Sequence, residues 1–480
     1  MWGALGRLFL IPALLAACAE NPVTHHRELV LVSEAQEIAQ GRALHPKVIQ
    51  HFGRYPDEGL QTYVQGVGER LAAHSHRPQL IYRFTVLDSP ETNAFSLPGG
   101  YIYVMRGLLA YLNSEAELAA VLGHEIGHVA ARHSVRQQTM ATAASLGYTL
   151  GSVFFPELRT QTAKNIYDIL GTAVIRGYGR QMELEADRLA AQYMARVGYD
   201  PKAILEVLRT LKALDDFERS LKREEVPVYH GLFATHPDED TRLKALIAEI
   251  PPAAHPLEGR ERYLDHIEGL AFGPPAKEGV LRRNHFYHKG LGFAMTFPKG
   301  WKVENRPERL SASPPSGDAL LQVLLIPRHF RLPPRDFLKK RLAVKAIDRG
   351  EAFTHFGLPG YTGIARLSTP FGKRPVRLVV IYFRDKALVF AGAARDEEDP
   401  FRYDGAFLAA ARSFHPLLDV ERPLAEPLRI RVIAAKPGTT FEALAAASPL
   451  PDHPAARLRL LNHLYPSGEP APGQPIKVVR

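Results

Sequence analysis

Apolar residues recur every three or four positions along residues 34–250, the spacing that places them on one face of an α-helix. Two segments interrupt this pattern. Residues 80–87 alternate between apolar and polar as a strand does, and residues 94–105 indicate a turn at Pro98-Gly99-Gly100 followed by a strand. Prolines at positions 251, 252 and 256 then break the helical pattern. The first half is therefore predicted to be mainly helical with a small sheet.

Residues 279–416 follow a different pattern, in which short apolar runs of strand length dominate. Strands are predicted at residues 292–297, 320–326, 376–383 and 387–391, and helices at residues 334–345 and 403–414. This combination predicts an α+β domain built on an antiparallel sheet. The last 60 or so residues are too few for a large core, and they predict a two-strand, two-helix unit.

The predicted organisation is thus α+β overall, with four parts. Residues 1–18 form an N-terminal leader, residues 19–255 a mainly helical domain, residues 256–420 the antiparallel-sheet domain, and residues 421–480 a small terminal domain. The total of 480 residues, with 46% hydrophobic and 23% charged positions, fits several globular domains and excludes a disordered or collagen-like chain.

Charge is unevenly distributed along the chain. Residues 1–250 carry 25 Lys and Arg against 28 Asp and Glu, whereas residues 251–480 carry 35 against 23. A basic second half favours an anionic surface as partner, although ordinary solvated Lys and Arg side chains explain the count equally well. Nucleic acid is disfavoured, because no long basic run occurs and because the leader described next directs export.

The N-terminus predicts an exported lipoprotein. One positive charge, Arg7, precedes an apolar stretch at residues 8–15, which is too short to span a membrane but typical of a signal peptide. Leu15-Ala16-Ala17-Cys18 resembles the lipobox of bacterial lipoproteins, in which the cysteine becomes the lipidated first residue. The alternative is a buried cysteine in an ordinary signal sequence. Cys18 is the single cysteine of the chain, so an intramolecular disulfide and a thiolate metal cage are excluded. Ala19 after Cys18 favours the outer membrane, with the protein on its periplasmic face.

The pentapeptide His124-Glu125-Ile126-Gly127-His128 carries the predicted chemistry. It lies in a helical pattern, so His124 and His128, four residues apart, share one face and can bind the same metal ion. Glu125 projects beside them, where it can take a proton from a metal-bound water. The alternative is a surface helix with two unrelated histidines.

A catalytic zinc site needs a third protein ligand and an open position. Residue 134 is serine, which excludes the metzincin spacing, and no acidic residue occurs between His128 and residue 157, which excludes short-spaced gluzincins. Glu183 opens the next strongly periodic helix, with Asp187 four residues later on the same face. Glu183 is therefore the predicted third zinc ligand, and Asp187 the acceptor for a ligand histidine. Glu185 is a reserve ligand, and solvated helix charges are the alternative explanation for Glu183 and Asp187.

These motifs resemble metallopeptidase family 48, the gluzincins that include the prenyl-protein proteases and HtpX. The resemblance rests on HEIGH, on the segment RQMELEAD at residues 180–187, and on Thr235-His236-Pro237 with Arg242. The lipobox and the segment NAFSLPGG at residues 93–100 are similar to the periplasmic, lipoprotein branch of outer-membrane assembly proteases. The resemblance covers roughly residues 20–250.

The resemblance implies a zinc metalloendopeptidase that binds one Zn²⁺ through His124, His128 and Glu183, with Glu125 as general base and acid. It implies misfolded or unassembled envelope proteins as substrates. It also implies that His236 can occupy the fourth zinc position as a latch, and that Arg242 supports the site through Asp187. A turn histidine is the alternative for His236. The strand at residues 101–105 is predicted to be the sheet edge that binds an extended substrate.

The chain departs from the assembly proteases in its C-terminal half, which lacks their helical repeats. Residues 421–480 instead resemble a degenerate LysM module, which implies peptidoglycan as a partner; a small packing domain is the alternative. Two other functions stay open: a latched protease acting mainly as a chaperone or adaptor, and an aminopeptidase, which is disfavoured because the G-x-M-E-N amine-binding motif is absent.

Overall fold

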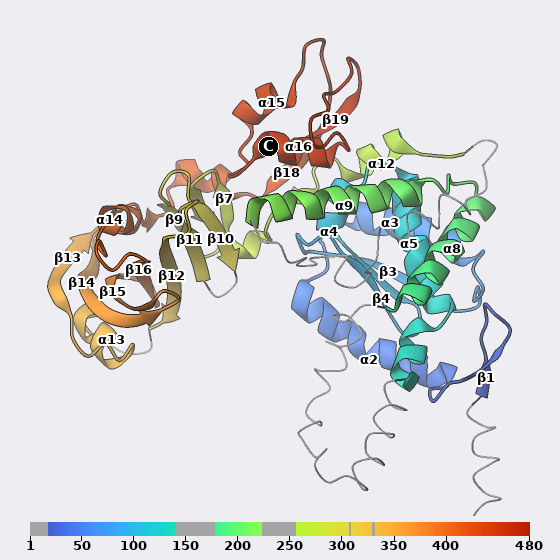
Figure 1. The fold of residues 1–480 in the computed structure, drawn as a ribbon, viewed down its shortest axis with the longest axis horizontal. Helices are drawn as coiled ribbons and strands as arrows, with labels where there is room; N and C mark the ends of the chain where they lie inside the picture. Colours follow the sequence, from blue (N-terminus) through green and yellow to red (C-terminus); the bar gives the residue numbers. More distant parts are fainter. Residues whose placement is uncertain (1–17, 141–177, 223–255, 307–308, 329–331) are drawn as a thin grey trace, which may run out of the picture. The chain divides into compact units, whose positions relative to one another are not determined.

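The structure, a computed structural model, describes residues 18–140, 178–222, 256–306, 309–328 and 332–480 (Figure 1). The chain divides into two compact units. The first unit takes the chain up to Phe272 together with Arg429–Phe441 and Ala455–Val478, and the second takes Gly273–Leu428, Glu442–Pro454 and Val479–Arg480. Both units combine helices with sheets, which confirms the predicted α+β class.

The first unit is mainly helical. Its helices with both ends among the described residues are α2 (Glu34–Phe52), α3 (Glu58–Ala72), α4 (Arg106–Tyr111), α5 (Glu115–Ala130), α8 (Arg180–Arg196), α9 (Ala203–Lys222), α12 (Arg260–Ile267) and most of α16 (Pro454–Leu461). Residues 133–140 are also helical. Local sequence fixes several helix starts: Ser33 and Gln36 form a capping box at α2, and the hydroxyl of Ser114 accepts from the backbone of Glu117 at α5. None of the helices in the described ranges is both long and apolar enough to cross a membrane.

A three-stranded sheet accompanies these helices, in the order β3 (Arg83–Leu87), β5 (Tyr101–Met105), β4 (Ala94–Leu97). Strands β3 and β5 are parallel, and β4 runs antiparallel to β5. The prediction that residues 101–105 form the sheet edge is therefore wrong. The Pro-Gly-Gly turn folds the preceding strand back onto β5, which leaves β5 in the centre and β4 at an edge.

Two smaller sheets complete the described part of the first unit. The chain begins its described part with a hairpin of β1 (Cys18–Glu20) and β2 (Arg27–Leu29). The second sheet has the order β19 (Pro475–Val479), β18 (Leu428–Ala434), β6 (Ala271–Phe272). With α15 (Phe441–Ala447) and α16, β18 and β19 supply the two strands and two helices expected near the C-terminus. The LysM resemblance of this segment stays a prediction.

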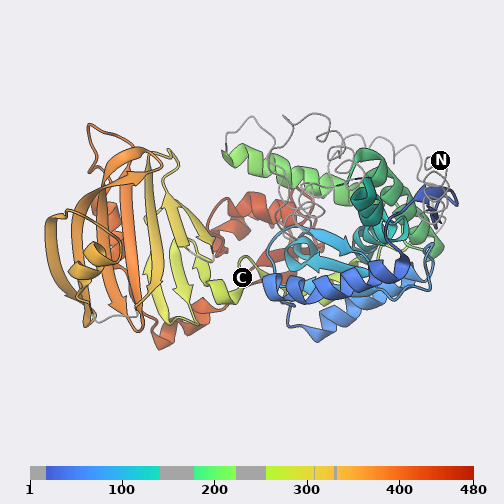
Figure 2. The same ribbon diagram turned by 90° about the horizontal axis from the view of Figure 1, so that it is seen from below.

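The second unit is built on a seven-stranded antiparallel sheet, seen with its strands side by side in Figure 2. Its order is β10 (Lys302–Arg306), β11 (Arg309–Ser313), β12 (Ala319–Pro327), β16 (Lys386–Ala394), β15 (Gly372–Phe383), β14 (Leu358–Thr369), β13 (Asp348–His355). A four-stranded sheet has the order β17 (His415–Pro416), β9 (Phe293–Thr296), β8 (His285–His288), β7 (Val280–Arg282). The remaining elements are α13 (Pro334–Lys340), α14 (Asp404–Arg412) and the short 3-10 helices Ala276–Glu278 and Asp419–Ala425.

Strand β15 explains how this sheet is held between two apolar layers. Val379 and Ile381 pack in one core cluster with Phe407 of α14, whereas Leu378 and Val380 pack in another with residues of α13. Because successive side chains of a strand point to opposite faces, both faces of β15 are buried. The strand predicted at residues 376–383, which contains the apolar run 378–383, lies within β15 and is confirmed.

Candidate metal centre

Helix α5 positions the HEIGH motif inside the first unit. Every residue of α5 from Glu115 to Ala130 is buried. His124 and His128 are one helical turn apart, so their rings project from the same side of the helix. The predicted helix at this motif is confirmed, and its complete burial rules out the surface-helix alternative for the two histidines.

Two glycines let α8 approach α5 closely. A methyl group added at Gly127 would lie 3.0 Å from the carbonyl oxygen and 3.1 Å from the Cα of Ala186, and one added at Gly123 would lie 3.3 Å from the Cα of Ala190. These pairs are each four residues apart, so one glycine face of α5 meets one alanine face of α8. The close backbone approach brings Glu183, in the first turn of α8, to the two histidines.

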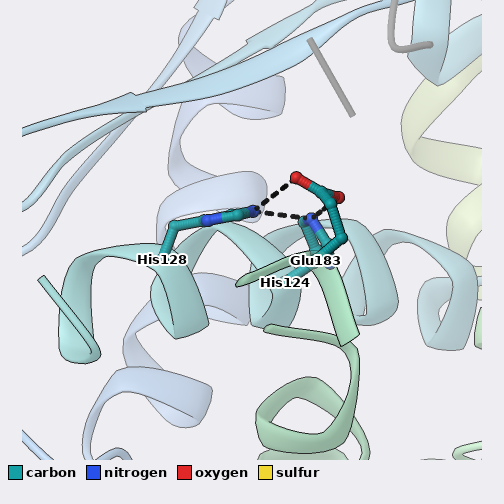
Figure 3. Close-up of side chains that lie close together, drawn as sticks. All are labelled: His124, His128 and Glu183. Atoms are coloured by element: carbon teal, nitrogen blue, oxygen red, sulfur yellow. Dashed lines mark hydrogen bonds and ion pairs between the residues drawn. The ribbon is translucent and has the colours of Figure 1, made fainter. Parts of the chain in front are cut away.

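The three side chains converge on one point, as Figure 3 shows. The Nε2 atoms of His124 and His128 are 2.9 Å apart, and the Glu183 carboxylate oxygens lie 3.4 Å from Nε2 of His124 and 3.6 Å from Nε2 of His128. Ligands about 2.0–2.1 Å from a tetrahedral zinc ion stand about 3.3 Å apart, a value that these separations bracket. The donor set of two imidazoles and one carboxylate, all buried, therefore fits a catalytic zinc ion.

Asp187 fixes the orientation of His124. Its carboxylate accepts from Nδ1 of His124 at 2.8 Å, which leaves Nε2 directed at the metal position. Burial alone lowers the pKa of His124, but hydrogen bonds to Asp187 and Glu183 outweigh it and raise the pKa overall. The structure thus places Asp187 where the sequence predicted it, one helical turn after Glu183.

His133 orients His128 in the same way, and no sequence motif pointed to it. Nδ1 of His133 lies 2.7 Å from Nδ1 of His128, and Nε2 of His133 lies 3.0 Å from the Glu185 carboxylate. A carboxylate only accepts, so Nε2 of His133 carries the proton. Burial lowers the pKa of His133 and keeps it neutral, so its Nδ1 accepts from His128 and leaves Nε2 of His128 available to a metal.

A left-handed residue explains why sequence reasoning missed His133. Helix α5 ends at Ala130, and Arg132 has a φ of 56°, which turns the chain so that His133 folds back on His128. A residue five positions along a continuous helix would point elsewhere. Non-glycine residues rarely adopt this conformation, so the spacing of the two histidines carried no signal.

Glu185, the reserve ligand, contacts His133 and not the metal position. Its carboxylate accepts from His133 and from the Arg136 guanidinium, both at 3.0 Å, and it is not part of the converging donor set. Arg136 also lies 3.2 Å from Glu28 of β2. A chain of polar contacts thus runs from His128 to the N-terminal hairpin.

We expect His133→Leu to weaken Zn²⁺ binding about 10- to 100-fold, because His128 loses the acceptor that fixes its tautomer. Competition with a chromophoric zinc chelator measures the affinity. Glu185→Gln is the matched control: its amide oxygen still accepts from His133, so it should weaken binding less. Equal zinc affinity in wild type and His133→Leu would contradict the assigned role of His133.

A cleft opens beside the donor set. Its lining includes His124, Glu125 and Asp187 on one side, and on the other the apolar residues Ile204, Val207, Leu208 and Leu211 of α9. Glu125 is 1% exposed and reaches this cleft next to His124. A carboxylate in such a position can exchange protons with a molecule bound between the two helices.

Tyr178 closes the site on the side of His128. Its ring stacks on the His128 ring, with centroids 4.0 Å apart and an interplanar angle of 20°. Its hydroxyl lies 2.7 Å from Oγ of Ser134, and burial raises its pKa. Tyr178 therefore stays neutral and holds the imidazole plane in place. His236 and Arg242, the predicted latch and supporting arginine, lie outside the described residues.

Comparison with known proteins decides the family. The model of Peptidase family M48 matches residues 58–250. The mitochondrial metalloendopeptidase OMA1 of Saccharomyces cerevisiae is 30% identical over 246 residues, which cover 48% of this chain and 69% of that protein. The chain belongs to peptidase family M48. This is the family that the motifs predicted.

Bacterial members of family M48 are similar over a shorter region. The beta-barrel assembly-enhancing protease of Escherichia coli K12 is 32% identical over 194 residues, which cover 39% of this chain and 38% of that protein. The chain thus spans less than half the length of this relative. Among solved structures, cyanobacterial PsbP from Synechocystis sp. PCC 6803 matches 30% of this chain and 98% of its own chain, at 17% identity and a TM-score of 0.24.

Proposed function

We propose that the chain is a zinc-dependent endopeptidase with its ion held by His124, His128 and Glu183. The observation that carries the proposal is the convergence of these three buried donors at zinc-like separations. Asp187 and His133 support it, because each occupies the Nδ1 atom of a different histidine and directs Nε2 to the common point.

Glu125 is the proposed general base and general acid. Bound zinc supplies Lewis acidity, which polarises the scissile carbonyl and makes water a better nucleophile. Glu125 takes the proton of the attacking water and returns it to the leaving amine. The apolar wall of α9 excludes bulk water from the cleft, which strengthens the electrostatic interactions inside it.

Unfolded or unassembled envelope proteins are the proposed substrates. The name of the bacterial relative, an assembly-enhancing protease, supports this class. An extended peptide can add to a strand edge through backbone hydrogen bonds, which demands little of the substrate sequence. Strand β4 lies at the edge of the sheet next to β5, and it is the strand proposed to pair with the substrate.

We further propose that the protein is attached to the outer membrane through lipid on Cys18 and faces the periplasm. The lipobox-like sequence and the single cysteine support this location. Envelope proteins are then the polypeptides within reach. Peptidoglycan is the proposed partner of the LysM-like C-terminal segment.

The test uses the chain from Ala19 onward with unfolded casein as substrate. We expect about one zinc per chain, cleavage that a chelator abolishes, and recovery on adding back Zn²⁺. N-terminally blocked peptides should be cleaved, which separates an endopeptidase from an aminopeptidase. A chain that binds zinc stoichiometrically but cleaves neither substrate would overturn the endopeptidase proposal in favour of an adaptor.

A further inference from the structure

The C-terminal segment contacts both helices that border the cleft. It consists of the residues of the first unit between Ala455 and Val478, more than 300 positions after α5 in sequence. Lys477 of this segment contacts the junction of α4 and α5. His463 contacts α9, which forms the apolar wall of the cleft (Figure 1).

Lys477 anchors the segment at the junction of α4 and α5. Its wholly buried ammonium donates to the carbonyl oxygens of Ala110 and Leu112, each at 2.7 Å. These carbonyls are at the C-terminal end of α4, where a helix leaves its acceptors unsatisfied. The side-chain amide Nδ2 of Asn113, one residue later, donates to the carbonyl of Leu461 at 3.0 Å. The start of the metal-binding helix is thus tied to the C-terminal segment by buried polar contacts.

His463 joins this anchor to α9. Its Nε2 lies 3.1 Å from the carbonyl oxygen of Tyr111 and 2.8 Å from Oγ1 of Thr210, which is buried on α9 next to the cleft residue Leu211. Burial lowers the pKa of His463 to about 3, so the ring is neutral. Its Nε2 lies within hydrogen-bond distance of both Tyr111 and Thr210. Glu117 of α5 lies 3.6 Å from the same Nε2.

Two further contacts reinforce the link. Asn462 binds the backbone of Lys477 on both sides: its Oδ1 accepts from the amide at 2.7 Å and its Nδ2 donates to the carbonyl at 2.8 Å. Toward the end of α9, the Phe217 ring meets the Tyr465 ring edge-on at 5.9 Å. Asn462, the neighbour of His463, therefore joins the His463 contacts to the Lys477 contacts.

We propose that the C-terminal segment is a brace that fixes the spacing of α5 and α9 across the peptidase cleft, with His463 and Thr210 as positioning residues. The proposal rests on the proposed peptidase function. The metal donors do not depend on the brace, because α5 and α8 meet directly at Gly123 and Gly127. Loosening the brace therefore changes how a substrate fits between α5 and α9, while zinc binding and proton transfer persist.

The test compares matched substitutions at both ends of the bridge in the chain from Ala19 onward. Thr210→Val and His463→Leu remove the hydrogen bond, whereas Thr210→Ser and His463→Gln retain a partner of similar reach. We expect the first pair to raise KM for casein about 3- to 10-fold, with kcat and zinc content unchanged, and the second pair to stay near wild type. The double variant Thr210→Val with His463→Leu should be no worse than His463→Leu alone, because that single variant has already lost the contact with Thr210.

Two kinetic outcomes would overturn the brace. A fall in kcat at constant KM would mean a loss of folded enzyme only, and additive KM effects would mean that the two residues act separately. Amide hydrogen exchange provides a readout that needs no cleavage: Thr210→Val should speed exchange in α9 and leave α5 and α8 unchanged. If the wild type fails to cleave, the peptidase proposal fails, and unchanged exchange in α9 would independently reject the brace.

Discussion

Glu125→Gln should abolish measurable cleavage while leaving zinc bound. The amide has nearly the same shape as the carboxylate but cannot take a proton from water, and loss of a general base costs about 10²- to 10⁴-fold in rate. The three donors belong to other residues, so the metal content should stay at the wild-type level. Single-turnover cleavage of casein and elemental analysis of the same preparation measure the two quantities.

Glu58→Gln is the control for this experiment. Glu58 is also a helical glutamate, but its side chain is 77% exposed at the start of α3. The Glu58→Gln variant should cleave casein at the wild-type rate. Near-normal cleavage by Glu125→Gln would remove Glu125 from the mechanism, whereas zinc loss in that variant would mean that Glu125 helps to hold the donor set.

Glu37→Gln should strongly destabilise the first unit. Glu37 on α2 is 1% exposed and accepts from Arg77 at 2.9 Å and from Arg132 at 3.0 Å. Both arginines are buried, so a neutral amide between them leaves two guanidinium groups without their shared counter-charge. Breaking a buried pair in this way costs about 3–5 kcal/mol. Native-state hydrogen exchange of α2 and α5 measures the free energy of unfolding.

Glu34→Gln provides the matched control, because Glu34 pairs with the same Arg77 at 2.9 Å but is 53% exposed. An exposed pair contributes at most about 1 kcal/mol, so this variant should stay close to the wild type. Equal losses for the two variants would show that burial does not set the strength of this network. The network matters for the site because Arg77 also donates to the carbonyl of Val129, just after His128.

Helices and strands in which apolar residues recur at a regular spacing could be predicted from the sequence. Helix α5, helix α8 and strand β15 all follow from local apolar spacing, which depends only on neighbours in the chain. The same reasoning selected Glu183 and Asp187, because both lie on one face of a helix. Strand β14 was missed, since its Pro359, Gly360 and Gly363 weaken the strand signal and partner strands supply the order.

The contacts that could not be predicted are those that join distant or irregular segments. His133 reaches His128 only because Arg132 is left-handed. Lys477 donates to the carbonyl of Ala110, which is 367 positions away in sequence. From sequence alone, a lysine in a C-terminal strand is expected to be solvent-exposed. Sequence patterns record which face of an element is apolar, but not which other element covers it.

The N-terminal hairpin has a consequence for where the enzyme can work. Strand β1 starts at Cys18 itself and pairs with β2, whose Glu28 contacts Arg136 near the metal centre. If Cys18 carries the proposed lipid, no flexible tether separates the bilayer from the folded peptidase unit. The distance between the bilayer and the candidate active site is then set by the dimensions of that unit and not by a linker. Such an enzyme cannot search the periplasm, and its substrates have to arrive at the membrane surface.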